Sequence, residues 1–498
     1  MVSDVPDPAE SEFLVIGADA TAGEEADATA GEFEQGEQQA ADAADDGHVA
    51  DEPTGPATVW TRADWYACLA LTVISLLLVG LHIRAYETLS PIDELQHVDY
   101  VIRAGEFDIP RRNEQVGAEA MAEAACRSVD APGYEGPPCG LDEYDPNDFQ
   151  ENGFNTAASQ FPPYYVVTGV SARVLAGLGV FDSKVTAART LGALWAAAAW
   201  SVVWYLMAVL GIRRSARAVA VALLITTPLI VFHAGATVNA DVSLMLCGAL
   251  AMLATVKFEM GRFHAGWLIL TFVGLYFVEA TNILAIAACA VYLVVRRGLD
   301  TSLSWRVRLA PLLVLPVLVF FRLSVADRVH NALFPPAPRK RASERLSAAP
   351  MFVNHRTDEV SLEKIVAQLE STFTPVRNPY FSPPLRSQLT IAGVQLTNWV
   401  LIALMFATAF VVVAGARLTW WARVTIVALL AAGPFYTFYF AYFSNQDFPA
   451  PARFALPLVP FIAVVVAAAL QSRAALWAAS IVAAIAALNT VMQLLTAQ

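Results

Sequence analysis

Long apolar runs fill most of the sequence from Trp65 onward and constrain the fold more than any other feature. Most are about 20 residues long, the length at which a helix crosses the hydrocarbon layer of a bilayer. The chain has 56% hydrophobic and 15% charged residues, far from the balance of soluble domains. This composition argues against a soluble enzyme and a nucleic-acid-binding protein. We expect an all-α multi-pass membrane protein with eleven transmembrane helices, near residues 65–84, 187–210, 217–236, 240–257, 265–280, 282–296, 308–325, 394–415, 420–443, 452–471 and 474–494.

Two apolar stretches decide this count. Residues 265–296 are too long for one span, so we expect two short helices broken near Glu279. Residues 163–180 begin at a proline and contain Arg173. If this stretch does not cross, the arginine-bearing loops all fall on the side of the N-terminus, as the positive-inside rule requires. We therefore interpret 163–180 as a helix in the outer membrane interface and expect a cytoplasmic N-terminus.

The remaining segments are polar. Residues 1–60 hold 16 of the 45 acidic residues and no Lys or Arg, so we expect residues 1–58 to form a disordered acidic cytoplasmic tail. Residues 59–498 would form the transmembrane domain. It has two large outward loops, residues 85–186 and 326–393. In the second loop, VSLEKIVAQLEST has apolar residues at helical spacing and predicts a short amphipathic helix lying on the bundle.

The first outer loop opens with an acidic motif, SPIDELQHVDY. Asp93 and His97 are four residues apart and share one face if the segment is helical. Glu94 and Asp99 add two acids. An acidic helix start after a proline needs no function, because carboxylates complement the helix dipole. Against that alternative, ionisable groups at the lipid boundary are costly unless they have a role or a partner. We therefore predict that Asp93 and Glu94 are catalytic residues.

Two further motifs are expected on the same face. The stretch FNTAASQFPPYYVV enters the interfacial helix, and Tyr164 and Tyr165 would anchor it at the membrane interface. The stretch FHAGATVNAD would gather His233, Asn239 and Asp241 at an outer turn. A polar turn and a first-turn acid are the ordinary alternatives for the last two residues.

The fourth motif is NQDFPAPARFALPLVPF, in which Arg453 begins the tenth span on the outer side. An arginine on the outer side is an exception to the positive-inside rule. We therefore expect Arg453 to have an acidic or a phosphate partner. The cluster Arg339–Lys340–Arg341 in the second loop is another candidate phosphate contact, or else an ordinary solvated basic loop.

The order of these motifs resembles the GT-C superfamily of integral-membrane glycosyltransferases. The similarity consists of a carboxylate pair after the first span, a PP-aromatic-aromatic entry, an N-x-D turn and a late R-F-x-L-P-x-x-P stretch, over roughly residues 65–471. The chain looks closest to a poorly characterised bacterial and archaeal group with a D-E-x-x-H first loop. Its layout is also similar to protein O-mannosyltransferases, the aminoarabinose transferase of lipid A and oligosaccharyltransferase catalytic subunits. One departure is Glu279, where related enzymes often carry a basic residue.

The resemblance implies a function at the plasma membrane. A sugar on a polyprenyl phosphate in the outer leaflet would be transferred to a glycan, lipid or protein acceptor. Asp93 would be the general base. Asp93, Glu94 and Asp241 could also bind acceptor hydroxyls or a divalent metal, Mg or Mn. The other implied substrate-binding residues are His97, Tyr164, Tyr165, Asn239 and Arg453. His97 has a further possible role as a metal ligand or as a hydrogen-bond partner of Asp93.

Two other classes of function stay open. A transporter or flippase for a lipid-linked sugar would show internal repeats and ionisable residues at mid-bilayer. Apart from Glu279, the predicted spans are nearly free of charge, and no internal repeat is visible. A non-catalytic assembly protein for lipid-linked glycans is the other alternative.

The five cysteines divide into two groups. Three lie in predicted spans and would be buried apolar side chains. Cys126 and Cys139 lie in the first outer loop, which faces an oxidising compartment in this topology. We predict a disulfide between them that holds the loop over the candidate site.

Overall fold

The computed structural model describes residues 60–91, 93–129, 135–231, 235–298, 304–338, 360–373, 388–412, 415–439 and 452–496. Within these ranges the regular secondary structure is helical and no β-strand is found. The predictions for the tail at 1–58, for His233 and for the cluster Arg339–Lys340–Arg341 lie outside the described residues.

Nine helical segments in the described ranges are long and apolar enough to span a membrane. They agree with the expected all-helical, multi-pass membrane protein. These segments are α2 (Arg62–Ala85), α6 (Lys184–Val209), α9 (Val242–Glu259), η5–α11 (Ala280–Gly298), α12–α14 (Trp305–Leu333), α16 (Gln388–Phe410), α17 (Ala416–Phe438), η11–α18 (Ala452–Ala469) and α19 (Arg473–Thr496).

Two of the eleven expected spans are shorter than a bilayer needs. The third contains α7 (Arg214–Ile225), which stops before Pro228, and the four-residue helix α8 (Pro228–Val231). The fifth is α10 (Ala265–Val278), with 14 residues. At about 1.5 Å per residue, α7 and α10 are only about 20 Å long, below the roughly 30 Å of the hydrocarbon core. The expected break after α10 is present, because Glu279 has an extended backbone.

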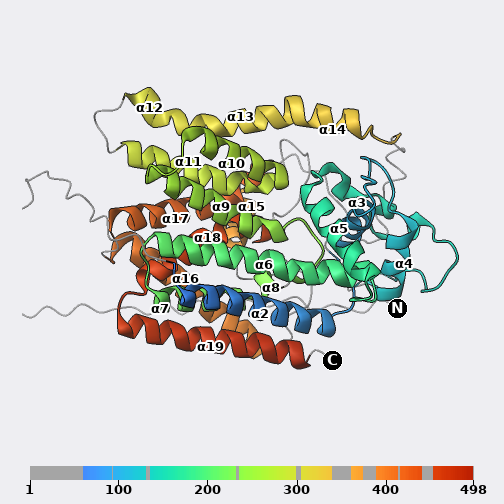
Figure 1. Ribbon diagram of the computed structural model, residues 1–498, viewed down its shortest axis with the longest axis horizontal. Helices are drawn as coiled ribbons and strands as arrows, with labels where there is room; N and C mark the ends of the chain where they lie inside the picture. The colour runs from blue at the N-terminus through green and yellow to red at the C-terminus, as the bar shows by residue number, and fades with distance from the viewer. Residues whose placement is uncertain are drawn as a thin grey trace, which may run out of the picture. The chain divides into compact units, whose positions relative to one another are not determined.

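Three helices of the first loop gather at one end of the helical bundle, beyond the C-terminal end of α2 (Figure 1). They are α3 (Glu94–Ala104), α4 (Ala118–Arg127) and α5 (Pro163–Gly177). The 15 residues of α5 are too few for a span, in keeping with the expected non-crossing helix.

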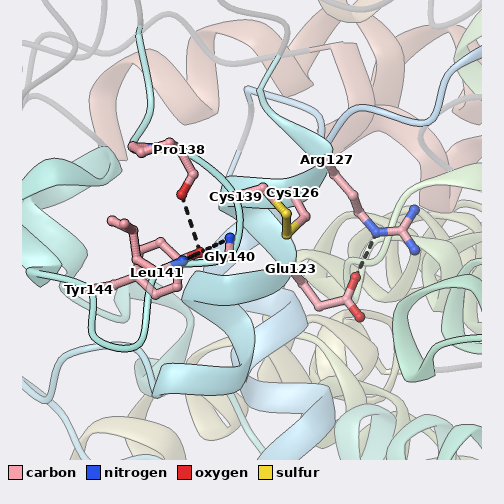
Figure 2. The surroundings of a disulfide bond; sticks show 8 residues. All are labelled: Glu123, Cys126, Arg127, Pro138, Cys139, Gly140, Leu141 and Tyr144. Carbon is pink, nitrogen blue, oxygen red and sulfur yellow. Dashed lines mark hydrogen bonds and ion pairs between the residues drawn. A yellow bond between two sulfur atoms is a disulfide. The ribbon is translucent and has the colours of Figure 1, made fainter.

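The first loop is covalently closed. A disulfide joins Cys126, in the last turn of α4, to Cys139, as expected from the sequence (Figure 2). The Tyr144 hydroxyl accepts hydrogen bonds from the N–H groups of Gly140 and Leu141, at 3.0 and 3.2 Å. The segment after the disulfide is therefore held as a compact turn.

The second loop is shorter than expected, because α14 continues to Leu333 and α16 begins at Gln388. Within the loop, α15 (Leu362–Phe373) is the predicted amphipathic helix. It packs against α17 and against η11, the helical turn that carries Arg453. The second loop therefore reaches the segment that carries Arg453.

Basic residues gather at the other end of the bundle. Glu259, at the end of α9, accepts hydrogen bonds from Arg296 and Arg417, at 2.9 and 3.0 Å. Arg213, at the start of α7, donates to the carbonyl of Leu470, just before α19. The basic connections thus share one end, opposite to α3–α5 (Figure 1). That this end is cytoplasmic stays a prediction.

Candidate functional site

Asp93 immediately precedes α3, in the left-handed region with φ of 55°. Asp and Asn tolerate this region better than most residues. The conformation lets the backbone turn sharply into the helix. The side chain of Asp93 is 39% exposed, and its Oδ2 lies 3.5 Å from Nη2 of Arg453. Asp93 is therefore a partly solvated carboxylate next to a cation.

Arg453 joins two of the predicted site residues. It lies in η11 (Ala452–Leu458), and its side chain is only 8% exposed. Its Nε is 3.0 Å from Oδ2 of Asp241, which directly precedes α9. Burial raises the pKa of Asp241; the charge of Arg453 opposes this rise and that of Asp93 adds to it. Arg453 therefore has the expected acidic partner, and in fact has two, which lie on separate segments.

A glycine contact allows this approach. A Cβ on Gly248 would overlap the carbonyl oxygen of Pro457, so only glycine lets α9 lie this close to η11. Gly169 of α5 similarly lies against the backbone of Val101 and Gly105 in α3. Backbone contacts of this kind fix helix positions closely, because no side chain separates the two helices. They set the positions of the helices that carry or adjoin Asp241, Arg453 and His97.

Glu94 faces away from Asp93 and into the protein. Both of its carboxylate oxygens accept a 2.8 Å hydrogen bond from Arg189 of α6. They also accept hydrogen bonds from the N–H groups of Ser90 and Val238, at 2.6 and 2.9 Å. The side chains of Glu94 and Arg189 are 1% and 2% exposed. A buried carboxylate with four hydrogen bonds tethers the loop to α6, and this geometry favours a structural over a catalytic role for Glu94.

His97 lies one turn beyond Asp93 and is buried. Its Nδ1 is 2.7 Å from the hydroxyl of Tyr165, and the two rings are stacked. The Tyr165 hydroxyl also contacts Oε1 of Gln160, and the ring of Tyr100 stacks on that of Tyr165 with centroids 3.7 Å apart. Burial, and secondarily the charge of Arg453, lower the pKa of His97 to about 3. His97 is therefore a neutral hydrogen-bonding residue at physiological pH.

The two tyrosines do not lie at the surface. Tyr164 is 1% and Tyr165 0% exposed, and Tyr164 packs against Trp195 of α6. Their interpretation as membrane-interface anchors is therefore wrong. The physical reason is that α5 packs against both α3 and α6, which cover this face of the helix. Asn239 is buried too, and its amide donates to Thr237 in the turn before α9.

The structure brings together some predicted residues and adds others. Asp93, Asp241 and Arg453 are in contact, and His97 is within the electrostatic influence of Arg453. Glu151 was missed. Burial, with the charge of Asp93 adding to it, raises its pKa to about 7. Glu279 was expected at a helix break and as a departure from related enzymes but not as a site residue, and it interacts electrostatically with Asp241. An acid alone in an apolar stretch was the signal available for it.

The four candidate metal ligands do not form one group. Glu94 is held by Arg189, His97 contacts the Tyr165 hydroxyl, and Asp93 and Asp241 contact Nη2 and Nε of Arg453. Among the described residues, no group of three or more His, Cys, Asp or Glu side chains is placed to hold a metal ion. This donor set does not fit a divalent cation, and we assign no step to one.

Comparison with protein-family models, with curated proteins and with solved structures finds no match to this chain. The resemblance to GT-C glycosyltransferases therefore stays a prediction based on the four motifs.

Proposed function

We propose that the protein is an integral-membrane glycosyltransferase. It would move a sugar from a polyprenyl-phosphate donor to a hydroxyl of a glycan, lipid or protein acceptor at the outer membrane face. The observation that carries the proposal is the group Asp93–Arg453–Asp241 at one end of an apolar helical bundle. There, a partly exposed carboxylate lies next to a guanidinium, at the level where a lipid-linked phosphate would present its sugar.

Asp93 would act as the general base. It takes the proton of the acceptor hydroxyl while that oxygen bonds to the anomeric carbon of the sugar. The bond between the anomeric carbon and the phosphate oxygen breaks, and the polyprenyl phosphate leaves with the electron pair. Base assistance of this kind contributes about 10²–10⁴-fold in rate. Asp93 suits the role because it is the exposed member of the carboxylate pair.

Arg453 would bind the departing phosphate. A guanidinium has five N–H donors, and the ion pairs of Arg453 with Asp93 and Asp241 are made by Nη2 and Nε. A phosphate would be bound by the donors that remain. Asp241 holds Arg453 in place through their ion pair, and would be a positioning residue. Glu94 would support the same geometry by tying the start of α3 to α6 through Arg189.

The test uses the full-length protein in liposomes. Radiolabelled polyprenyl phosphates carrying glucose, mannose or arabinose are supplied with a total membrane lipid extract as acceptor. We expect one donor to be converted to polyprenyl phosphate and a labelled product. Wild-type protein that consumes none of these donors would count against the proposal. Movement of intact donor across the bilayer would instead support a flippase.

A further inference from the structure

The end of the bundle opposite to Asp93 contains a cleft of about 520 Å³. It lies between the start of α2, the end of α6 and the start of α7. One acid, Asp64, and three arginines, Arg213, Arg214 and Arg217, contribute to its walls. Nothing in the proposed glycosyl transfer uses these residues.

The charges in this cleft do not balance. Asp64 pairs with Nη2 of Arg214 at 3.0 Å and with Nη1 of Arg217 at 3.2 Å. Arg213 donates to the backbone carbonyls of Leu470 and Gln471, which carry no net charge. One carboxylate therefore faces three guanidinium groups, and a positive charge of two is left over.

The cleft also offers unused donors. The side chain of Arg217 is 6% exposed, and its Nε has no hydrogen-bond partner in the described part of the chain. Arg213 is the N-cap of α7, and no side chain caps this end. The first N–H groups of a helix lack partners within it, and its dipole attracts anions. Arg213, Arg214 and Ser215 line the cleft, so this helix end lies at its wall.

We propose that this cleft binds a phosphate group, and that its source is the headgroup of an anionic phospholipid. The aromatic residues beside it favour a lipid over a soluble phosphate. Trp60 lines the cleft, and Trp65 and Tyr66 are exposed in the first turn of α2. Such residues gather at the membrane–water interface. A basic pocket between helices at that depth is a typical site for acidic lipid headgroups.

The experiment measures lipid binding to the full-length protein by native mass spectrometry. Phosphatidylglycerol and phosphatidylcholine are supplied at equal concentration in mixed micelles. We expect wild-type protein to prefer phosphatidylglycerol by about tenfold, because the excess of two positive charges attracts the anionic headgroup and salt screens part of this attraction. Equal binding of the two lipids would overturn the proposal.

Two variants test the site itself. Arg214→Gln removes one exposed charge and should lower the preference several-fold. Ser215→Asp adds a carboxylate in the first turn of α7, which favours the helix but repels a phosphate, and should abolish the preference. Arg262→Gln makes the same charge change in the α9–α10 turn, outside the cleft, and should have no effect. Wild-type binding by both cleft variants would refute the site.

A competition arm separates the two sources of phosphate. Inorganic phosphate is added at millimolar concentration to the wild-type complex with phosphatidylglycerol. Retention of the lipid supports a headgroup site in which the acyl chains contribute. Displacement of the lipid, together with tight binding of phosphate alone, would overturn the assignment to a lipid. Neither result depends on glycosyl transfer.

Discussion

The two ends of the helical bundle carry opposite arrangements of charge. At the end with α3–α5, one arginine, Arg453, lies between the carboxylates of Asp93 and Asp241. At the other end, one carboxylate, Asp64, pairs with Arg214 and Arg217. In both groups the central residue is buried, whereas one outer residue is exposed: Asp93 at 39% and Arg214 at 49%.

The exposed residue of each group determines which chemistry that end of the bundle can support. In each group the central residue holds its neighbours in place, and the exposed residue is the more accessible to a ligand. The proposed phosphate contact of Arg453 would use the small part of its side chain that is exposed. An exposed carboxylate can take a proton from a hydroxyl group. An exposed guanidinium can bind a phosphate but cannot act as a base, because it stays protonated at any physiological pH. The proposed catalysis is therefore placed at the first end and the proposed lipid binding at the second.

The largest expected effect is loss of activity in Asp93→Asn. Removal of the base should lower the rate of sugar transfer by about 10²–10⁴-fold. Folding should be preserved, because Asn also tolerates the left-handed backbone at this position. The measurement is transfer in liposomes alongside the thermal midpoint in detergent. Asp108→Asn, at an exposed acid beyond the end of α3, is the matched control and should stay active. Full activity in Asp93→Asn would remove the catalytic distinction between the ends.

The next largest effect is a loss of stability, which should differ between the two ends of the bundle. Arg189→Met leaves the carboxylate of Glu94 buried without its cation, which costs about 3–5 kcal/mol. Arg214→Gln, at a half-exposed arginine, should lower the thermal midpoint much less. The double variant Arg189→Met with Glu94→Gln should recover part of the loss. Equal losses in Arg189→Met and Arg214→Gln would contradict the description of Glu94 as a buried anchor.

The disulfide should contribute less to stability than the ion pair of Glu94 and Arg189, and only at the end with α3–α5. Opening Cys126–Cys139 by Cys126→Ser removes a short loop closure, which the chain-entropy treatment values at about 3 kcal/mol. A reductant should lower the thermal midpoint of wild-type protein but not that of the variant. Cys68→Ser, at a free cysteine in α2, serves as control and should keep the response to reductant. An unchanged wild-type midpoint in reductant would show that the disulfide does not stabilise the loop.

The smallest effect is a pH dependence from Glu151. Its pKa is raised from 4.5 to about 7 in the folded protein, so the folded state binds the proton more tightly than the unfolded state. The contribution of Glu151 to the free energy of unfolding should therefore fall as pH rises from about 4.5 to about 7. Glu151→Gln should remove this contribution from the slope measured by thermal unfolding between pH 5 and 8. His97, with a pKa lowered from 6.5 to about 3, contributes the opposite slope up to about pH 6.5 in both proteins, so the slope of the wild type is compared with that of the variant. Identical slopes in wild type and variant would rule out Glu151 as the source.

Sequence patterns predicted local features better than they predicted which residues contact each other. Apolar runs predicted the long helices, and the excess length of residues 265–296 predicted a break near Glu279. The length of α7 was overestimated, because apolar residues continue past the point where Pro228 interrupts the helix. Burial of Tyr164 and Tyr165 was missed, since an interfacial tyrosine and a packed one look alike in a sequence.

Several contacts at the candidate site join residues far apart in the chain. Glu94 and Arg189 are 95 positions apart, and no periodicity links them. Sequence reasoning made Asp93 the general base and Glu94 a ligand for acceptor hydroxyls or a metal, and did not predict the buried ion pair of Glu94. It also expected Arg453 to have an acidic or phosphate partner, but could not tell that it would have two acidic ones.

The sequence by itself determined the helical membrane architecture, the separation of basic and acidic loops, and the pairing of two nearby cysteines. Each follows from local composition or short spacing, because transfer of an apolar segment into a bilayer depends mainly on that segment alone. Only the tertiary structure decided that Glu94 is buried and Asp93 exposed. The burial of a charged side chain depends on whether a distant segment supplies its counterion, and Arg189 and Arg453 reach these two neighbours from different helices.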